Sequence, residues 1–179
     1  MKKIIISLFV ALLFSACEKD VIIYDPGNME YGMATAKKNG ADWTASAYGV
    51  NSQIKGYFGL LLQTFHLNVI NRETISFQYM PIKVGKYKVH PVHFPYYIID
   101  TIAASHYGIL IDDGDVAGDS YTVDDSVSDN EIEVTYIDTI AGIARGRFKV
   151  TFKVDKPKKE SYLPDCVEFS EGSFNVTFL

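Results

Sequence analysis

The chain has 179 residues, 47% of them hydrophobic and 13% aromatic, and it carries 22 acidic against 17 basic side chains. This composition excludes an intrinsically disordered chain, because enough apolar surface is present to build a core. The mildly acidic balance gives no support to nucleic-acid binding, and two cysteines are too few for a disulfide framework. We therefore expect a folded domain without a nucleic-acid partner.

The first sixteen residues have the layout of a secretory signal peptide. Lys2 and Lys3 precede the apolar run Ile4–Phe14, which the small residues Ser15 and Ala16 follow. The run is about half of the roughly 20 residues that a membrane-spanning helix needs. The pattern predicts a cleaved leader over residues 1–16 rather than a permanent transmembrane anchor.

The end of this leader and the residue after it, Leu13–Cys17, read "LFSAC" and resemble the lipobox of bacterial lipoproteins. The resemblance implies cleavage before Cys17, which then carries a diacylglycerol and an N-acyl chain such as palmitate. Each buried methylene contributes about 0.8 kcal/mol, so several acyl chains hold a soluble domain at a membrane. Glu18 stands where inner-membrane lipoproteins commonly have Asp, which implies the outer membrane and leaves open whether the domain is periplasmic or on the cell surface.

Residues 17–30 are expected to tether the lipid to a single domain over residues 31–179. If Cys17 is lipidated, the second cysteine, Cys166, has no partner. We expect Cys166 to be a partly buried apolar side chain rather than a nucleophile.

The domain alternates apolar and polar residues with a period of two, which is typical of half-buried antiparallel strands. One expected strand places Phe148, Val150, Phe152 and Val154 on its inner face, a second places Ile132, Val134 and Tyr136 there, and a third Phe174, Val176 and Phe178. Asn39-Gly40 is the sequence of a type I′ hairpin turn. Trp43, just after that turn, is expected to be a core residue.

About ten or eleven such strands and no long helix predict an all-β fold. We expect a single-domain antiparallel β-sandwich, with a closed lipocalin-like β-barrel as the alternative. Eleven acids and no Lys or Arg lie between Lys88 and Arg145, whereas Lys and Arg dominate residues 145–159. If the strand with Glu131 and Glu133 pairs with the strand that carries Arg147 and Lys149, these charges face each other and the asymmetry is structural.

Three segments resemble small lipoproteins of Bacteroidetes: "ATAKKNGADWTASA", "ARGRFKVTF" and "VEFSEGSFNVTF". Those families open with an Asn-Gly hairpin followed by Trp and close with Gly-x-Phe strands, here Gly146-Arg147-Phe148 and Gly172-Ser173-Phe174. The resemblance covers both ends of the domain and little of residues 90–130. It implies the same location and an all-β fold, and it brings no activity or catalytic residues.

Two groups of residues are candidate sites. Asp113, Asp115 and Asp119 in "DDGDVAGD" supply the oxygens that calcium prefers, although the spacing departs from that of an EF-hand. Phe94, Tyr96 and Tyr97 lie beside two prolines and suit stacking on a glycan or contact with a protein partner. Apart from calcium and the covalent lipid, no cofactor is expected.

The chain carries no Gly-x-Ser-x-Gly, His-Glu-x-x-His or phosphate-binding glycine motif. We therefore expect a binding or structural accessory protein rather than an enzyme. The alternatives are a carrier of a small apolar ligand and an exported hydrolase with a site in residues 90–130.

Overall fold

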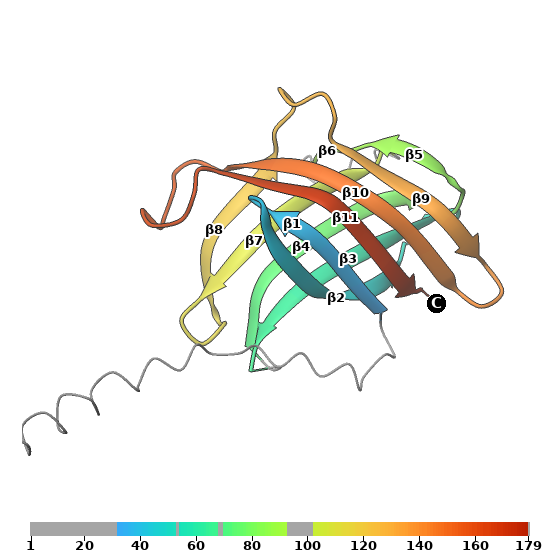
Figure 1. Ribbon diagram of the computed structural model, residues 1–179, viewed down its shortest axis with the longest axis horizontal. Helices are drawn as coiled ribbons and strands as arrows, with labels where there is room; N and C mark the ends of the chain where they lie inside the picture. Colours follow the sequence, from blue (N-terminus) through green and yellow to red (C-terminus); the bar gives the residue numbers. More distant parts are fainter. Residues whose placement is uncertain (1–31, 53, 68–69, 93–101, 179) are drawn as a thin grey trace, which may run out of the picture.

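The computed structural model describes residues 32–178 except 53, 68–69 and 93–101 (Figure 1). Among the described residues, no helix is long and apolar enough to cross a membrane. The strands are β1 (Gly32–Lys38), β2 (Ala41–Asn51), β3 (Tyr57–His66), β4 (Ile70–Pro81), β5 (Gly85–Lys88), β6 (His90–Pro91), β7 (Ala104–Ile111), β8 (Val116–Val123), β9 (Glu131–Asp138), β10 (Ile143–Val154) and β11 (Cys166–Thr177).

These strands form a closed antiparallel barrel. Its strands follow one another in the order β1, β2, β3, β4, β7, β8, β10 and β11, and β11 closes the ring by pairing with β1. The all-β class is therefore confirmed. The arrangement is the barrel that the sequence left as the alternative, because a sandwich would leave β1 and β11 unpaired as the edges of separate sheets.

Closure depends on β10, which is long enough to have two different partners along one edge. Residues 143–149 of β10 pair with β9, whereas Phe152–Val154 pair with β8. Between these two parts, the Thr151 N–H donates to the side-chain oxygen of Asn130 at 2.8 Å, and the Thr151 carbonyl accepts from the N–H of Asp124 at 2.9 Å. The loop between β8 and β9 thus supplies the bonds that a continuous strand would otherwise make.

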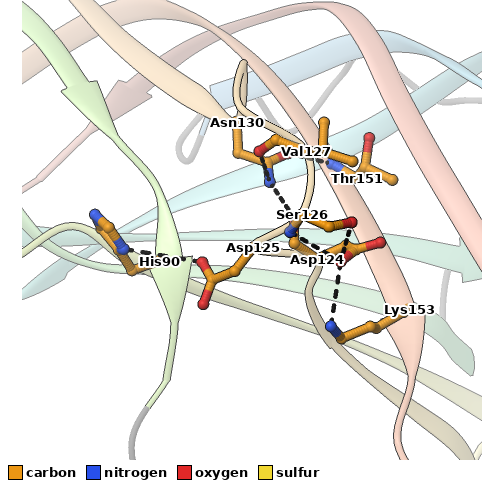
Figure 2. A network of polar contacts seen from close by, with 8 residues as sticks. All are labelled: His90, Asp124, Asp125, Ser126, Val127, Asn130, Thr151 and Lys153. Carbon is orange, nitrogen blue, oxygen red and sulfur yellow. Dashed lines mark hydrogen bonds and ion pairs between the residues drawn. The ribbon is translucent and has the colours of Figure 1, made fainter.

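Asn130, the last residue of this loop, makes three of its side-chain hydrogen bonds (Figure 2). Its amide nitrogen donates to the carbonyl of Asp124 at 2.8 Å and to the carbonyl of Val127 at 3.1 Å. The Asp124 carboxylate accepts from the N–H and hydroxyl of Ser126, which holds its pKa below the ordinary value. Asn130 is 2% exposed, so every bond it makes is shielded from water.

Replacing Asn130 with alanine is expected to destabilise the domain. The change leaves the Thr151 N–H and two carbonyls without their partner, at about 1–3 kcal/mol for each buried group left unsatisfied. Urea denaturation followed by tryptophan fluorescence measures the loss. Asp125→Ala in the same loop is the control, since that side chain is exposed and its ion pair within the described part of the chain is a long one, 3.9 Å to His90. Equal stability of the two variants would contradict the role of Asn130.

The short strands β5 and β6 lie outside the ring of eight strands and connect β9 with β7. β5 pairs with β9, and β6 pairs with β7 in parallel. Val89, between them, is buried, and its N–H donates to the carbonyl of Asn130 at 3.0 Å. One extended segment therefore changes partner and joins the two edges.

The barrel has two unlike ends. The Gly32 end contains the start of β1, the β2–β3 connection near Lys55, the β4–β5 connection at Lys83 and Val84, and the β9–β10 turn. The polar end contains the turns at Asn39-Gly40 and Asp112–Asp115 and the loop 155–165. In Figure 1 the β9–β10 turn and the C-terminus lie at the right, and the loop 155–165 lies at the left.

The predicted alternation is confirmed in β10 and β11, where the inward Phe and Val side chains are buried. The Asn39-Gly40 turn is also confirmed, with φ of 50° and 82°, and Trp43 is buried. Tyr136 is an error of the prediction, because it is 44% exposed rather than inward-facing. The register of β9 on β10 shifts between Arg145 and Gly146, which turns Tyr136 outward under the Arg145 guanidinium, 5.2 Å from the ring centroid.

The two Gly-x-Phe motifs pair with each other across β10 and β11. Gly146 lies opposite Phe174, and Phe148 lies opposite Gly172. Each ring covers the facing glycine, since a Cβ on Gly146 would lie 2.4 Å from the Phe174 ring and one on Gly172 would lie 2.7 Å from the Phe148 ring. Such cross-strand aromatic–glycine pairs protect the glycine backbone and fix the register.

Candidate functional site at the polar end of the barrel

A charged pair lies inside the polar end. Lys38 is the last residue of β1, Glu73 lies on β4, and their side chains form an ion pair and are 23% and 17% exposed. The second carboxylate oxygen of Glu73 accepts from the Trp43 indole N–H at 2.8 Å. The pair is therefore shielded by the barrel wall yet still reached by water from the polar end.

Aromatic rings fill the barrel directly below this pair. Tyr107 is the centre of the layer, with its ring centroid 5.1 Å from Tyr121, 5.4 Å from Phe169 and 5.6 Å from Phe152. Trp43 joins it through Phe169 at 5.1 Å. We call these five residues the aromatic layer. Ring separations of 4.5–7 Å are those of packed aromatic pairs, so the layer is a floor rather than a cavity.

Tyr107 connects the layer to the charged pair. The Lys38 ammonium lies 5.5 Å from the Tyr107 ring centroid, a distance typical of a cation–π contact. Burial, and then the nearby Glu73 carboxylate, raise the pKa of Tyr107 far above its ordinary value, so its hydroxyl stays protonated. That hydroxyl is buried and makes no hydrogen bond to any described residue. The Glu73 carboxylate lies close enough to raise the pKa of this hydroxyl by its charge and by hydrogen bonding, although the two groups do not have the geometry of a full hydrogen bond.

Tyr121 shows how the same group is satisfied elsewhere in the layer. Its hydroxyl donates to the carbonyl of Pro164 at 2.9 Å, at the base of the loop 155–165. Burial, and then Asp119, raise the pKa of Tyr121 to about 12. The two hydroxyls therefore differ in their hydrogen bonding. The Tyr121 hydroxyl already donates to a carbonyl, whereas the Tyr107 hydroxyl makes no full hydrogen bond to a described residue.

Sequence reasoning did not find this site. Lys38, Trp43, Glu73 and Tyr107 come from four strands, and no short motif contains two of them with a recognisable spacing. A signal was nevertheless present in the alternation. Lys38 continues the inward series of Ala34 and Ala36, and Glu73 precedes the inward Ile75 and Phe77. Opposite charges at inward positions of two strands predict an internal pair.

The three predicted calcium ligands lie in two places. Asp113 and Asp115 share the β7–β8 turn, and the hydrogen bond between their side chains lowers the pKa of Asp113 and raises that of Asp115. Asp119 is buried on β8, where its two oxygens accept from the N–H groups of Lys159 at 2.6 Å and Glu160 at 3.2 Å. No three His, Cys, Asp or Glu side chains of the described ranges are grouped to hold a metal. Calcium binding stays a prediction.

The other predicted residues are placed as follows. Phe94, Tyr96 and Tyr97 and the lipidation residue Cys17 lie outside the described residues. Cys166 is exposed, so the expectation of a partly buried side chain is wrong. It begins β11 with its side chain on the outer face, because Val167 occupies the next inward position. Desolvation, and then Asp124 and Glu168, raise the pKa of its thiol, which disfavours a nucleophilic thiolate.

The charge asymmetry is structural, as predicted. Arg147 lies opposite Glu133 and Lys149 opposite Glu131 across the β9–β10 pair. Lys86 of β5 extends this network through an ion pair with Glu131 at 3.0 Å. These side chains line a shallow hollow of about 430 Å³ on the outer wall. Acids and bases alternate around it, so it presents no field of one sign to a charged ligand.

The polar end is chemically suited to binding. The cluster offers a carboxylate acceptor, an ammonium donor and a phenol donor, all held by strands. It contains one carboxylate, whereas the usual glycosidase mechanism needs two, one on either side of the scissile bond.

No protein-family model, curated protein or solved structure matches the chain. The functional argument therefore rests on the geometry of the cluster.

Proposed function

We propose that the protein is a lipid-anchored binding protein of the outer membrane that takes a small polar ligand at the polar end of its barrel. The observation that carries the proposal is the buried Tyr107 hydroxyl, which has no hydrogen-bond partner among the described residues. An unsatisfied buried hydroxyl costs about 1–3 kcal/mol. Tyr107 is fully buried, so a ligand oxygen recovers that free energy only where the Lys38–Glu73 pair above the ring parts to admit it, and the hydroxyl is then a binding determinant.

The ligand class follows from the balance of charge. Lys38 and Glu73 neutralise each other, so the cluster as a whole favours neither a cation nor an anion. What remains is a set of donors and acceptors close together, which suits a neutral molecule with several hydroxyl groups. The proposed ligand is therefore a saccharide, in the form of the end of a glycan chain. Lys38 and Tyr107 donate to it, and Glu73 accepts from it.

An apolar ligand fits this end of the barrel less well. A carrier of the lipocalin type needs an apolar cavity that removes most of the ligand from water. Here the aromatic layer occupies the barrel below the charged pair, and the pair itself would lose hydration without compensation. Hydrolysis is also disfavoured at this cluster, because Glu73 is its one carboxylate among the described residues, whereas the usual glycosidase mechanism needs two.

Removing the Tyr107 hydroxyl separates binding from stability. Tyr107→Phe is expected to raise the free energy of unfolding by about 1 kcal/mol, because it deletes an unpaired buried polar group. The melting temperature then rises by about 2–4 °C. The same variant should bind a saccharide several-fold to about tenfold more weakly, since one ligand hydrogen bond of about 0.5–1.5 kcal/mol is lost.

The measurements are thermal unfolding and chemical-shift titration with neutral oligosaccharides of glucose, galactose and N-acetylglucosamine, with palmitate as the apolar rival. Tyr121→Phe is the matched control, because its hydroxyl already donates to Pro164 and its loss should lower stability. A Tyr107→Phe variant that melts below the unaltered protein would contradict the proposal. Chemical-shift changes around the aromatic layer that appear with palmitate and not with the oligosaccharides would also contradict it.

A further inference from the structure

Most of the large exposed apolar side chains of the described residues lie at the Gly32 end of the barrel, whereas Leu67, Val116 and Tyr162 lie at the polar end. Ile140, in the β9–β10 turn, is 94% exposed, and Val84, Val50 and Met33 are 54%, 48% and 46% exposed. Together with Lys55 and Lys83 we call these side chains the Gly32 rim. Large exposed apolar residues grouped on one surface mark a contact site for a partner or a membrane.

Backbone contacts bring the members of the rim together. The N–H of Phe178 donates to the carbonyl of Gly142 at 2.6 Å, which places the β9–β10 turn at the end of β11. Gly32 of β1 lies opposite Val176 of β11, and Gly49 of β2 packs directly on Phe178, just after β11. The N–H of Ile82 donates to the carbonyl of Gly56 at 2.9 Å, which joins the two lysine-bearing connections.

Ile140 is held in its exposed position rather than left free. The Asp138 carboxylate accepts from the N–H groups of Ile140 and Ala141, each at 2.9 Å. These bonds hold the pKa of Asp138 below its ordinary value. The turn therefore exposes the apolar Ile140 side chain to water, which is unfavourable. The Asp138 carboxylate beside it is held by backbone donors.

The rim carries two available lysines beside the ionised Asp138, whose carboxylate is held by backbone donors. Lys55 and Lys83 are exposed, and neither forms an ion pair with any residue in the described ranges. Apolar side chains beside free lysines match a bilayer surface, where the former enter the headgroup layer and the latter meet phosphates. A protein partner would need acidic side chains opposite these lysines, whereas a bilayer presents phosphate groups across its whole surface.

The described chain begins at the same end of the barrel, which favours the bilayer as the occupant. β1 begins at Gly32, at this same end, and Cys17 lies 15 positions earlier in the chain (32 minus 17). Even fully extended, that length of chain spans about 50 Å. We infer that the Gly32 rim docks on the headgroup layer of the membrane that anchors the protein, and that the polar end faces away from it. The inference rests on the lipid at Cys17 that is part of the proposed function.

The test compares the two ends of the anchored protein. The mature lipidated chain carrying Cys166→Ser and Ile140→Cys is labelled with an environment-sensitive dye and reconstituted in vesicles of phosphatidylethanolamine and phosphatidylglycerol. We expect blue-shifted emission and several-fold weaker quenching by aqueous iodide than for the same dye at Tyr162→Cys. Tyr162 is 69% exposed in the loop 155–165 at the polar end. Equal quenching at the two positions overturns the inference.

Two further measurements separate the possible failures. Lys55→Glu with Lys83→Glu should restore quenching of the dye at Ile140→Cys, whereas Lys159→Glu at the polar end should not. Protection that rises with protein density and not with lipid indicates a second copy of the chain, and it overturns the inference. Flotation of the labelled protein with the vesicles reports the anchor separately. Protein that does not float contradicts the proposed lipidation, and protein that floats with equal quenching contradicts only the orientation.

Discussion

Replacing Gly146 with alanine is expected to lower the melting temperature by about 2–12 °C. A Cβ at this position would lie 2.1 Å from the carbonyl oxygen of Glu133 and 2.4 Å from the Phe174 ring. Neither can withdraw easily, because the carbonyl belongs to the β9–β10 pair and the ring is buried in the core. Overpacking of this kind costs about 1–3 kcal/mol, and each kcal/mol corresponds to about 2–4 °C for a domain of this size.

The reciprocal position behaves in the same way. A Cβ on Gly172 would lie 2.6 Å from the carbonyl oxygen of Phe148, so Gly172→Ala should also destabilise. Gly108→Ala is the matched control, because the nearest atom to a Cβ there, on His106, is 3.9 Å away. Calorimetry of the three variants decides the matter. If Gly108→Ala costs as much as Gly146→Ala, the loss reflects strand glycines in general and not the aromatic pairs.

These pairs illustrate what the sequence could predict. Two Gly-x-Phe motifs are visible in the chain, and alternation places both phenylalanines inward. Their pairing with each other depends on the register of β10 on β11, which no local pattern specifies. The Asn39-Gly40 turn and the β9–β10 hairpin were predictable because they join strands that are neighbours in sequence. Tyr136 was not, since the register shift that turns it outward depends on its partner strand.

The choice between sandwich and barrel failed for a related reason. Both folds produce the same alternation of inward and outward residues, so periodicity alone does not separate them. The difference lies in Asn130 and β10. A buried asparagine that satisfies one N–H and two carbonyls allows β10 to change partner from β9 to β8 without a loss of hydrogen bonds. That role requires contacts between residues about twenty positions apart, which is beyond what spacing shows.

The two proposed contacts lie at opposite ends of the barrel, one at the polar end and one at the Gly32 rim. The proposed saccharide site depends on Lys38, Glu73 and Tyr107, and the proposed membrane contact depends on Ile140 and Val84. Because the strands connect these ends without a helix or hinge in the described residues, ligand binding is expected to leave the membrane contact unchanged. Each proposal can therefore fail without affecting the other.

Replacing Cys17 with serine is expected to remove the protein from the outer-membrane fraction. The lipobox reaction needs the cysteine sulfur, so the variant should incorporate no labelled palmitate. Without acyl chains, the membrane affinity that about 0.8 kcal/mol per buried methylene provides is lost. The rim alone would then bind weakly and reversibly, because stable attachment needs more than one signal. Palmitate labelling and membrane fractionation measure the two effects.

Cys166→Ser is the control for that experiment. Cys166 is an exposed free thiol on the barrel, so any labelling or attachment through an arbitrary cysteine would be lost with it. We expect Cys166→Ser to keep both palmitate and outer-membrane association. Palmitate on the Cys17→Ser variant would contradict the lipoprotein assignment, and retention of that variant in the outer membrane without palmitate would show that the rim alone is sufficient. The two variants thus distinguish a covalent anchor from a purely surface contact. Cys166 is exposed on the barrel, so its replacement by serine leaves the core unchanged.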